Sequence, residues 1–446
     1  MINSRSNNTP FWLILIGVSL ILVGRVLFAE GMFVDGVTYA SISRNMAEGL
    51  GSFWDPFYTL TLYPHFHQHP PLALGLEALL FKAFGDHLFV ERLYSLLMFM
   101  MSGLLIALIW KRTTNNIRWA WMPMLYWIAI PLVTWSASNN MLENTMTVFV
   151  LLSVYLMLVS YQRNHKIWLF LAGFSLFAVF LSKGFTGLFP LVFPLIYCAF
   201  DEKRRWIQGL VDGLLLVVTL TVLTGVMLLV FPPSLVYLKD YVNLQVIGGG
   251  LHEATVSSRF FIVFRLLQEL IVPVLILMVL MVLQKLVFKS KVKLFEFKPD
   301  RRRFFGFLIL GLAGVLPIMV SVKQSGFYMV AALPFFALAL GHASISYVNS
   351  IRETLKPNGL RHGILVGLSC VVLVCGLLMP WMGCHKYCRD EALIKGVKQV
   401  LAAHEEEQVL GIDPVDYNQW SWHAYFMRYG KVSLDTRNNN KIQLCY

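Results

Sequence analysis

The chain is 446 residues long, and 57% of its residues are hydrophobic while only 14% are charged. A soluble globular domain is roughly half apolar and about a quarter charged, so the composition excludes an ordinary water-soluble fold and indicates an integral membrane protein. The net charge of +12 does not indicate a nucleic-acid-binding protein, because the basic residues fall in short segments between hydrophobic stretches, as in membrane proteins generally.

Apolar segments recur along the chain at about the 20-residue length that is needed to cross the hydrocarbon core of a bilayer. The sequence predicts eleven spans, and a count of ten to twelve fits because several of them are short. The predicted spans cover residues 11–29, 89–110, 119–136, 142–160, 167–182, 185–200, 208–231, 261–284, 304–322, 325–345 and 363–383. Arg25 interrupts the first span and no small-residue cleavage site follows it, so we expect a retained signal anchor.

Lys and Arg residues are distributed unevenly between the two sets of loops. One set is rich in them, and the segment 285–303 alone holds eight. Because cytoplasmic loops carry the excess of Lys and Arg, we expect this set and the N-terminus to be cytoplasmic. The segments expected on the outer side are residues 30–88, residues 232–260 and the tail that begins at residue 384.

The first outer segment, residues 30–88, is too long for a simple turn. Residues 36–48 carry apolar side chains at helical spacing, and residues 71–84 form a second apolar stretch that is too short to span a membrane. We expect two helices that lie in the membrane interface.

The tail, residues 384–446, differs in composition from the spans. Its periodicity predicts two helices, at 389–404 and Trp420–Tyr429, and two short strands, at 408–412 and 431–434. Its roughly 60 residues are few for an independent core, so we expect a small α/β appendage that leans on the outer loops of a membrane module formed by residues 1–383. A disulfide between Cys445 and either Cys384 or Cys388 is an open alternative.

Polar and titratable residues are concentrated in the first outer segment. Asp35 lies where the chain leaves the first span, and the run from His65 to His69 precedes the second apolar stretch. Further along the chain, Glu143, Lys183 and Lys323 stand at the outer ends of spans. Ionisable residues at such places are candidates for function, so the sequence indicates chemistry at the outer membrane surface.

Several of these residues also have a structural explanation. Asp35 could cap the helix at 36–48, because Asp is a preferred N-cap residue. Lys183 and Lys323 could extend to the interface. Tyr39 and Tyr328 could belong to the aromatic belt that anchors membrane proteins.

The order of these residues resembles that of the GT-C glycosyltransferases, in particular the branch of the protein O-mannosyltransferases and the lipid A aminoarabinose transferase. That branch has an Asp-x-x-x-Tyr-Ala run, then Pro-Pro-Leu, an acidic residue that opens the fourth span, Lys-Gly between spans five and six, and a late Lys…Tyr…Pro run. The corresponding residues here are Asp35, Tyr39-Ala40, His69-Pro70-Pro71-Leu72, Glu143, Lys183-Gly184, Lys323, Tyr328 and Pro334.

The resemblance implies a GT-C type bundle that moves a sugar from a polyprenyl-phosphate-linked donor to an acceptor hydroxyl on the outer face, with inversion. It implies Asp35 as general base, since the attacking hydroxyl must lose a proton, and Glu143 as a second catalytic carboxylate that holds the acceptor or orients Arg44. Charge on the leaving phosphate requires cations or dipoles, and the residues implied to face it are Lys183, Lys323 and His69. The residues implied to bind substrate are Tyr39, Arg44, Gln68 and Tyr328.

The chain departs from this pattern just before its two prolines. Where the aminoarabinose transferase has Glu followed by Lys, this chain has Gln68 and His69. The loss of that carboxylate weakens any inherited metal site, so we predict no metal ligands and no cofactor, with a divalent metal as the open alternative.

A polytopic transporter or flippase of lipid-linked sugars is the alternative function. Transporters often show repeated halves and charges near the membrane midplane, whereas this sequence shows no internal repeat and its candidate charges sit at one face. The expected partners are the lipid-linked donor, a lipid, glycan or protein acceptor, and membrane lipids, with no nucleic acid. Likeness to the bacterial branch places the chain in the cell inner membrane as a multi-pass protein with a cytoplasmic N-terminus and a periplasmic tail.

Overall fold

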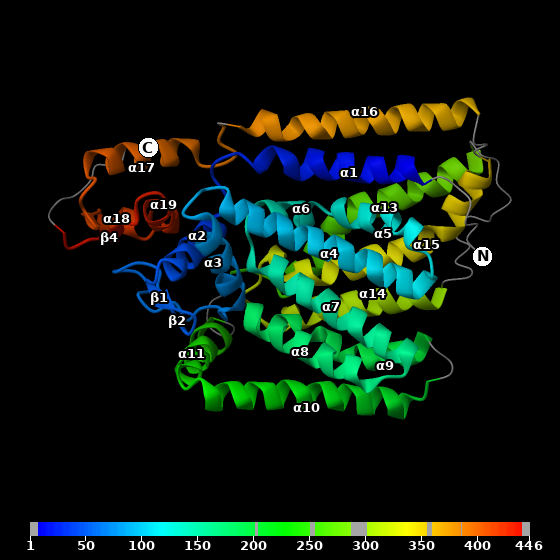
Figure 1. The fold of residues 1–446 in the computed structure, drawn as a ribbon, viewed down its shortest axis with the longest axis horizontal. Coiled ribbons are helices and arrows are strands. Elements are labelled where there is room, and N and C mark those ends of the chain that lie inside the picture. The colour runs from blue at the N-terminus through cyan, green and yellow to red at the C-terminus, as the bar shows by residue number, and fades with distance from the viewer. Residues whose placement is uncertain are drawn as a thin grey trace.

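The computed structural model describes residues 8–200, 204–249, 255–286, 301–354, 359–384 and 386–438. The long helices lie side by side, roughly parallel to the longest axis of the molecule (Figure 1). The first outer segment and the tail gather at one end of this bundle, and no large sheet is formed by the described residues.

Among the described residues, nine helical segments are long and apolar enough to cross a membrane. Their α-helices are α1 (Thr9–Val23), α4 (Val90–Thr114), α7 (Leu142–Arg163), α8 (Lys166–Lys183), α10 (Trp206–Val230), α13 (Phe261–Leu286), α14 (Arg301–Val315), α15 (Leu333–Thr354) and α16 (Leu360–Gly383). The predicted all-α polytopic fold is therefore confirmed.

The two other predicted spans consist of short helices in succession. The span at 119–136 is divided into α5 (Trp121–Ile128) and α6 (Pro131–Ser138), because Pro131 cannot continue the backbone hydrogen bonding of a preceding helix. The span at 185–200 is made of the 3₁₀ turns η3 (Gly184–Gly187) and η4 (Phe189–Val192), followed by α9 (Phe193–Phe200).

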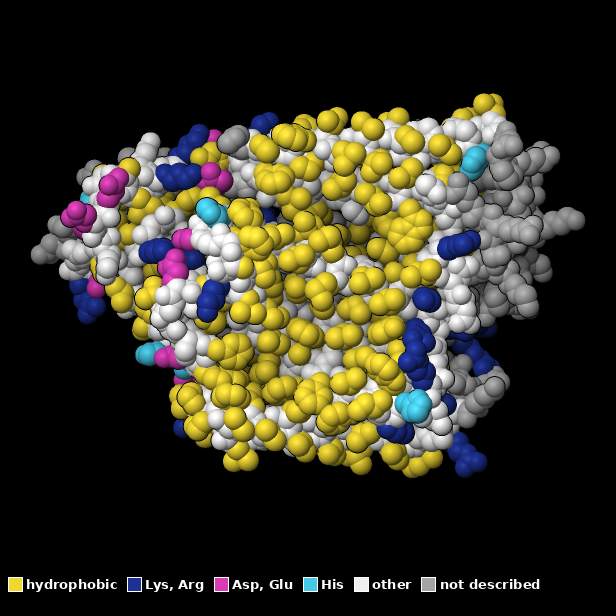
Figure 2. All heavy atoms as spheres, in the orientation of Figure 1, with side chains coloured by type: hydrophobic (Ala, Val, Ile, Leu, Met, Phe, Trp, Pro, Cys, Tyr) yellow, Lys and Arg dark blue, Asp and Glu magenta, His cyan; other side chains and the backbone are white. Residues whose placement is uncertain are grey.

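The centre and the periphery of the bundle differ in burial. In the most apolar stretch of α7, 83% of the residues are buried, and the corresponding share is 89% for the segment that contains α15. In α10 and α16 the share is only 17% and 11%. Figure 2 shows the consequence as a broad band of hydrophobic side chains over the bundle. Lys and Arg side chains line the edge of this band that lies farthest from the tail, as the positive-inside rule predicts for one membrane side.

The first outer segment contains the two helices expected from its sequence. They are α2 (Val34–Ala47) and α3 (Leu72–Phe84), separated by a short antiparallel hairpin of β1 (Gly51–Ser52) and β2 (Asp55–Pro56). The prediction that Asp35 caps the first helix is wrong, because the N-cap is Phe33 and Asp35 lies in the first helical turn. The backbone N–H of Phe33 instead donates to Asn139 Oδ1 at 2.7 Å, so a side chain from the bundle fixes the start of α2.

The tail contains all four elements predicted for it. Its elements are α17 (Glu391–Ala403), β3 (Val409–Gly411), α18 (Pro414–Tyr417), α19 (Trp420–Gly430) and β4 (Ser433–Asp435), with β3 and β4 paired in parallel. Its apolar core also includes Met32 and Val37 from the first outer segment, so the tail shares a core with that segment as expected. Cys445, one partner of the suggested disulfide, lies outside the described residues.

The second outer segment begins with α11 (Pro233–Tyr241) and continues as a π-helix, η5 (Val242–Gly249). Tyr237 on α11 is fully buried and its hydroxyl donates to the backbone carbonyl of His69. This contact holds the second outer segment against the end of the first.

Candidate active site

A buried ion pair joins the outer ends of two neighbouring bundle helices. Glu143 lies in the first turn of α7 and Lys183 is the last residue of α8. Because α7 and α8 are antiparallel neighbours, the start of one meets the end of the other, and Lys183 Nζ lies 2.8 Å from Glu143 Oε1. A helix N-terminus favours a carboxylate and a C-terminus favours an ammonium group, so both helices stabilise the charges that the pair requires.

The pair is almost completely removed from water, with side-chain exposures of 0% for Glu143 and 6% for Lys183. The second carboxylate oxygen, Glu143 Oε2, is also buried and has no hydrogen-bond partner among the described residues. A buried polar atom without a partner is costly. This oxygen is therefore a ready acceptor for a hydroxyl group that enters the site.

Asp35 contributes a second carboxyl group to the same place. It is half-buried in the first turn of α2. Burial raises the pKa of the Asp35 carboxyl, the Lys183 ammonium opposes this shift, and the Glu143 carboxylate adds to it. Asp35 therefore lies close enough to the Glu143–Lys183 pair for their charges to act on it, and an Asp with a raised pKa is better suited to accept a proton than an ordinary one.

Aromatic rings surround the ammonium group of Lys183. Its Nζ atom lies 5.8 Å from the centre of the Tyr39 ring, 5.6 Å from that of Phe327 and 5.9 Å from that of Tyr328. Rings at such distances attract a cation through their negative faces. Tyr39 comes from α2, while the other two come from the 3₁₀ helix η7 (Gly326–Ala332), so the cluster joins segments that are far apart in the sequence.

His69 and Lys323 border this cluster. The ring of His69 meets the ring of Tyr39 edge to face, with centroids 5.8 Å apart. Burial, followed by the charges of Lys183 and Lys323, lowers the pKa of His69 well below its ordinary value. His69 is therefore a neutral hydrogen-bonding group near neutral pH, whereas the two lysines are the cations.

The loop that carries Lys323 is held by a buried side chain that the sequence did not single out. Gln324 is only 2% exposed, and its amide donates to the carbonyl groups of Arg259 and Ser321, each at 2.9 Å. Its Oε1 atom accepts from the backbone N–H of Ile262 at 3.0 Å. A lone Gln beside a predicted lysine carries no signal in one sequence, because two of its three partners, Arg259 and Ile262, lie more than 60 positions away in the chain.

Arg44 lies outside the cluster formed by Glu143, Lys183 and the aromatic rings. Its guanidinium is 2.9 Å from Asp86 Oδ2 and donates to the carbonyl of Met427 at 2.8 Å, so Arg44 joins the first outer segment to the tail. The expectation that Glu143 orients Arg44 is wrong, because Glu143 pairs with Lys183. Gln68 is half-buried immediately before His69.

Glu77 is a further buried carboxyl group beneath α2. Ser43 Oγ donates to its Oε2 atom at 2.8 Å and Asn140 Nδ2 donates to its Oε1 atom at 2.7 Å. Burial raises the pKa of Glu77 to about 8. The signal that could have indicated this site in the sequence is the presence of an acidic residue within the apolar stretch at 71–84.

Within the described ranges, no three His, Cys, Asp or Glu side chains are arranged to hold a metal ion. The three histidines before the prolines do not gather at one point. His65 Nδ1 and His67 Nε2 both approach Asp55 Oδ1, at 2.8 and 3.3 Å, and His67 Nδ1 also lies 2.8 Å from Asp240. His69 alone lies beside the Glu143–Lys183 pair.

The central part of the chain matches a known family. Residues 68–233 match the model of the dolichyl-phosphate-mannose-protein mannosyltransferases. This range includes Glu143 and Lys183. A search of curated proteins by sequence gives no match.

ArnT and an archaeal oligosaccharyltransferase are among the proteins whose solved structures have the same fold. ArnT from Cupriavidus metallidurans bound to undecaprenyl phosphate has a TM-score of 0.65 and 15% identity, covering 95% of this chain and 85% of that one. The apo state of the same protein has a TM-score of 0.60, 14% identity and coverage of 95% and 88%. AglB from Archaeoglobus fulgidus, an archaeal oligosaccharyltransferase in complex with an inhibitory peptide and a dolichol-phosphate, has a TM-score of 0.52 and 11% identity, with coverage of 96% and 65%.

These matches extend over nearly the whole chain, although their sequence identity is low. The resemblance indicated by the sequence motifs is therefore confirmed, and the chain has the fold of the GT-C glycosyltransferases of the ArnT type.

Proposed function

We propose that this protein is a membrane glycosyltransferase that moves a sugar from a polyprenyl-phosphate-linked donor to a hydroxyl group of an acceptor on the outer face. The observation that carries the proposal is the buried Glu143–Lys183 pair at one end of the bundle, with Asp35 close enough for both charges to act on its carboxyl group. Two proteins of the same fold have structures with undecaprenyl phosphate or dolichol-phosphate, which supports a lipid phosphate as the leaving group.

Asp35 would act as the general base. As the acceptor oxygen attacks the anomeric carbon, its proton passes to the Asp35 carboxylate, and the bond between that carbon and the phosphate oxygen breaks. The phosphate departs with the electron pair of that bond and gains negative charge. Attack opposite the leaving group inverts the anomeric configuration without a covalent enzyme intermediate.

The lysines would stabilise the departing phosphate. Lys183 is held in place by Glu143, and Lys323 lies close enough for its charge to act on His69. Cations fixed where charge develops stabilise the transition state without reorganising. A neutral His69 would add a hydrogen bond rather than a charge.

The remaining side chains would bind the sugar and the acceptor. Glu143 Oε2, buried and without a partner in the described structure, is placed to accept a hydrogen bond from a substrate hydroxyl. Tyr39 and Tyr328 flank Lys183 and offer aromatic surface and hydroxyl groups to the sugar. Gln68 adjoins His69 and would contribute a polar contact.

The distribution of Lys and Arg residues indicates how the protein is oriented in the membrane. The edge of the hydrophobic band rich in Lys and Arg lies away from the tail (Figure 2), which supports a cytoplasmic N-terminus and an outer, periplasmic site in a bacterial inner membrane. Asp35, the first outer segment and the tail then share the outer face.

A transfer assay tests this proposal. The purified full-length protein in nanodiscs is incubated with a set of radiolabelled polyprenyl-phosphate sugars and host membranes as acceptor. Label that moves into a lipid, glycan or protein fraction supports the proposal and identifies the acceptor class. Movement of a labelled lipid-linked sugar across liposomes, with no transfer from any donor, would support a flippase instead.

A further inference from the structure

The tail helix α19 and the residue that follows it contact α2 at both of its ends. The hydroxyl of Tyr425 donates at 3.1 Å to the carbonyl of Met32, two residues before α2 begins. The carbonyl of Met427 accepts from Arg44 near the last turn of α2. Lys431 pairs at 2.6 Å with Glu48, the residue that follows the helix.

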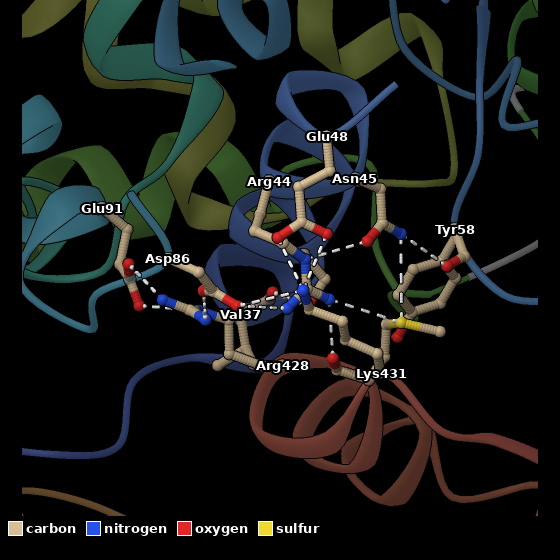
Figure 3. Close-up of polar contacts among 11 residues, drawn as sticks. Val37, Arg44, Asn45, Glu48, Tyr58, Asp86, Glu91, Arg428 and Lys431 are labelled. Carbon is tan, nitrogen blue, oxygen red and sulfur yellow. Dashed lines mark hydrogen bonds and ion pairs between the residues drawn. The ribbon is translucent and has the colours of Figure 1, made fainter. Parts of the chain in front are cut away.

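A network of charged side chains, buried except at Asp86, accompanies these contacts. Arg428 on α19 donates from Nε and Nη2 to the two oxygens of Glu91, at 3.1 and 3.0 Å, and lies 2.6 Å from Asp86 through Nη1. Arg44 on α2 lies 2.9 Å from the other oxygen of the same Asp86. Figure 3 shows Asp86 between the two guanidinium groups, with Glu91 on the far side of Arg428.

This network connects three parts of the protein. Glu91 belongs to the first turn of the bundle helix α4, Arg44 belongs to α2, and Arg428 belongs to the tail. The side chains of Arg428 and Glu91 are each 3% exposed, and that of Arg44 is 1% exposed. Buried charges of this kind require all their partners, and two parallel hydrogen bonds from one guanidinium fix direction as well as distance.

The opposite side of α2 has no room for movement. A Cβ atom at Gly36, next to Asp35, would lie 2.0 Å from the carbonyl oxygen of Asn139. Val37, on the next position, is packed in the core of the tail. The first turn of α2 is therefore held between the bundle and the tail.

We propose that Arg428 is a positioning residue for the transfer reaction, because through Glu91, Asp86 and Arg44 it holds α2 where Asp35 and Tyr39 meet Lys183. The inference rests on the proposed function, in which Asp35 is the base. It gives the tail a role in catalysis, although Arg428 touches none of the proposed reacting groups. It also assigns Arg44 to this network rather than to the substrate.

The experiment compares R428M with K395M in the full-length protein. Both variants remove one cation of the tail, but Lys395 is 57% exposed and pairs with Glu391 of its own helix, α17, whereas Arg428 is buried. We expect R428M to lower kcat about tenfold or more, since small displacements of reacting groups are costly, with the KM for the donor changed less than about twofold. K395M keeps kcat within about twofold of the wild type.

A double variant separates positioning from stability. R428M leaves the Glu91 carboxylate buried without its partner, and E91Q removes that charge. We expect R428M/E91Q to recover the melting temperature of the wild type while kcat stays about tenfold low. Recovery of kcat together with the melting temperature would overturn the proposal, because Arg428 would then be needed only for folding.

Hydrogen exchange provides a readout that needs no activity. We expect faster exchange of the amides of residues 36–45 in R428M than in K395M. Unchanged exchange there would overturn the proposal even if kcat fell. A wild-type protein that transfers no sugar would contradict the proposed function, and the exchange comparison would still decide whether Arg428 holds α2.

Discussion

Lys183 Nζ lies 2.8 Å from Glu143 Oε1, and both side chains are buried at the outer end of the bundle. The two residues are 40 positions apart in the sequence, and the antiparallel packing of α7 and α8 alone brings them together. Since both groups are shielded from water, removing either one leaves the other buried without its partner.

Removing Glu143 should destabilise the protein strongly. In E143Q the Lys183 ammonium stays buried without a carboxylate, and we expect the free energy of unfolding to fall by about 3 kcal/mol or more. K395M, which removes the exposed pair with Glu391 in α17, should cost less than about 1 kcal/mol. Thermal unfolding in detergent measures both, and a similar loss in the two variants would show that the Glu143–Lys183 pair contributes no more than a surface pair.

The pH dependence of turnover should report Asp35. Asp35 must be deprotonated to act as a base, so kcat rises with pH through its raised pKa. The carboxylate of Glu143 is one cause of that shift, and E143Q should therefore move the acid limb of the profile to lower pH. An acid limb that stays in place, or moves to higher pH, would argue that the limiting group is not Asp35.

Glu77 should make the stability of the protein depend on pH. Its folded pKa of about 8 lies above its ordinary value of 4.5 because the group is buried, so the folded state binds the proton more tightly than the unfolded state does. The stabilisation that protonated Glu77 contributes is fully present below about pH 4.5. It declines as the pH rises and is lost above about pH 8. E77Q keeps a neutral amide beside Ser43 and Asn140, and its melting temperature should decline less between pH 5 and 8 than that of the wild type. Equal declines in the two proteins would contradict this assignment.

The sequence predicted the elements of the fold well because their signals are local. Helical spacing of apolar residues indicated α2 and the tail helices, and a run of apolar residues indicated each long span. Where the expectation differed, another local feature prevailed, as at Pro131, which begins α6. Asp35 does not cap α2 because Asn139 from the bundle binds the N–H of Phe33.

The partners of the buried polar residues could not be predicted in the same way. Arg44 and Met427 lie 383 positions apart, and no spacing rule joins them in a single sequence. The same holds for Glu77 with Asn140 and for Tyr237 with His69. The candidate residues for the site were found from their order and type, while the pairing of Glu143 with Lys183 required the packing of two helices.

The most direct test of the account is the rate of sugar transfer by D35N beside the wild type and D413N. Asp413 is exposed in the tail and caps α18, and Asn is an equally good cap, so D413N changes the same chemical group away from the site. We predict that D35N lowers kcat by about a hundredfold or more, the contribution of a general base, while D413N transfers sugar at the wild-type rate. Wild-type transfer by D35N would contradict the central claim that Asp35 takes the proton from the acceptor.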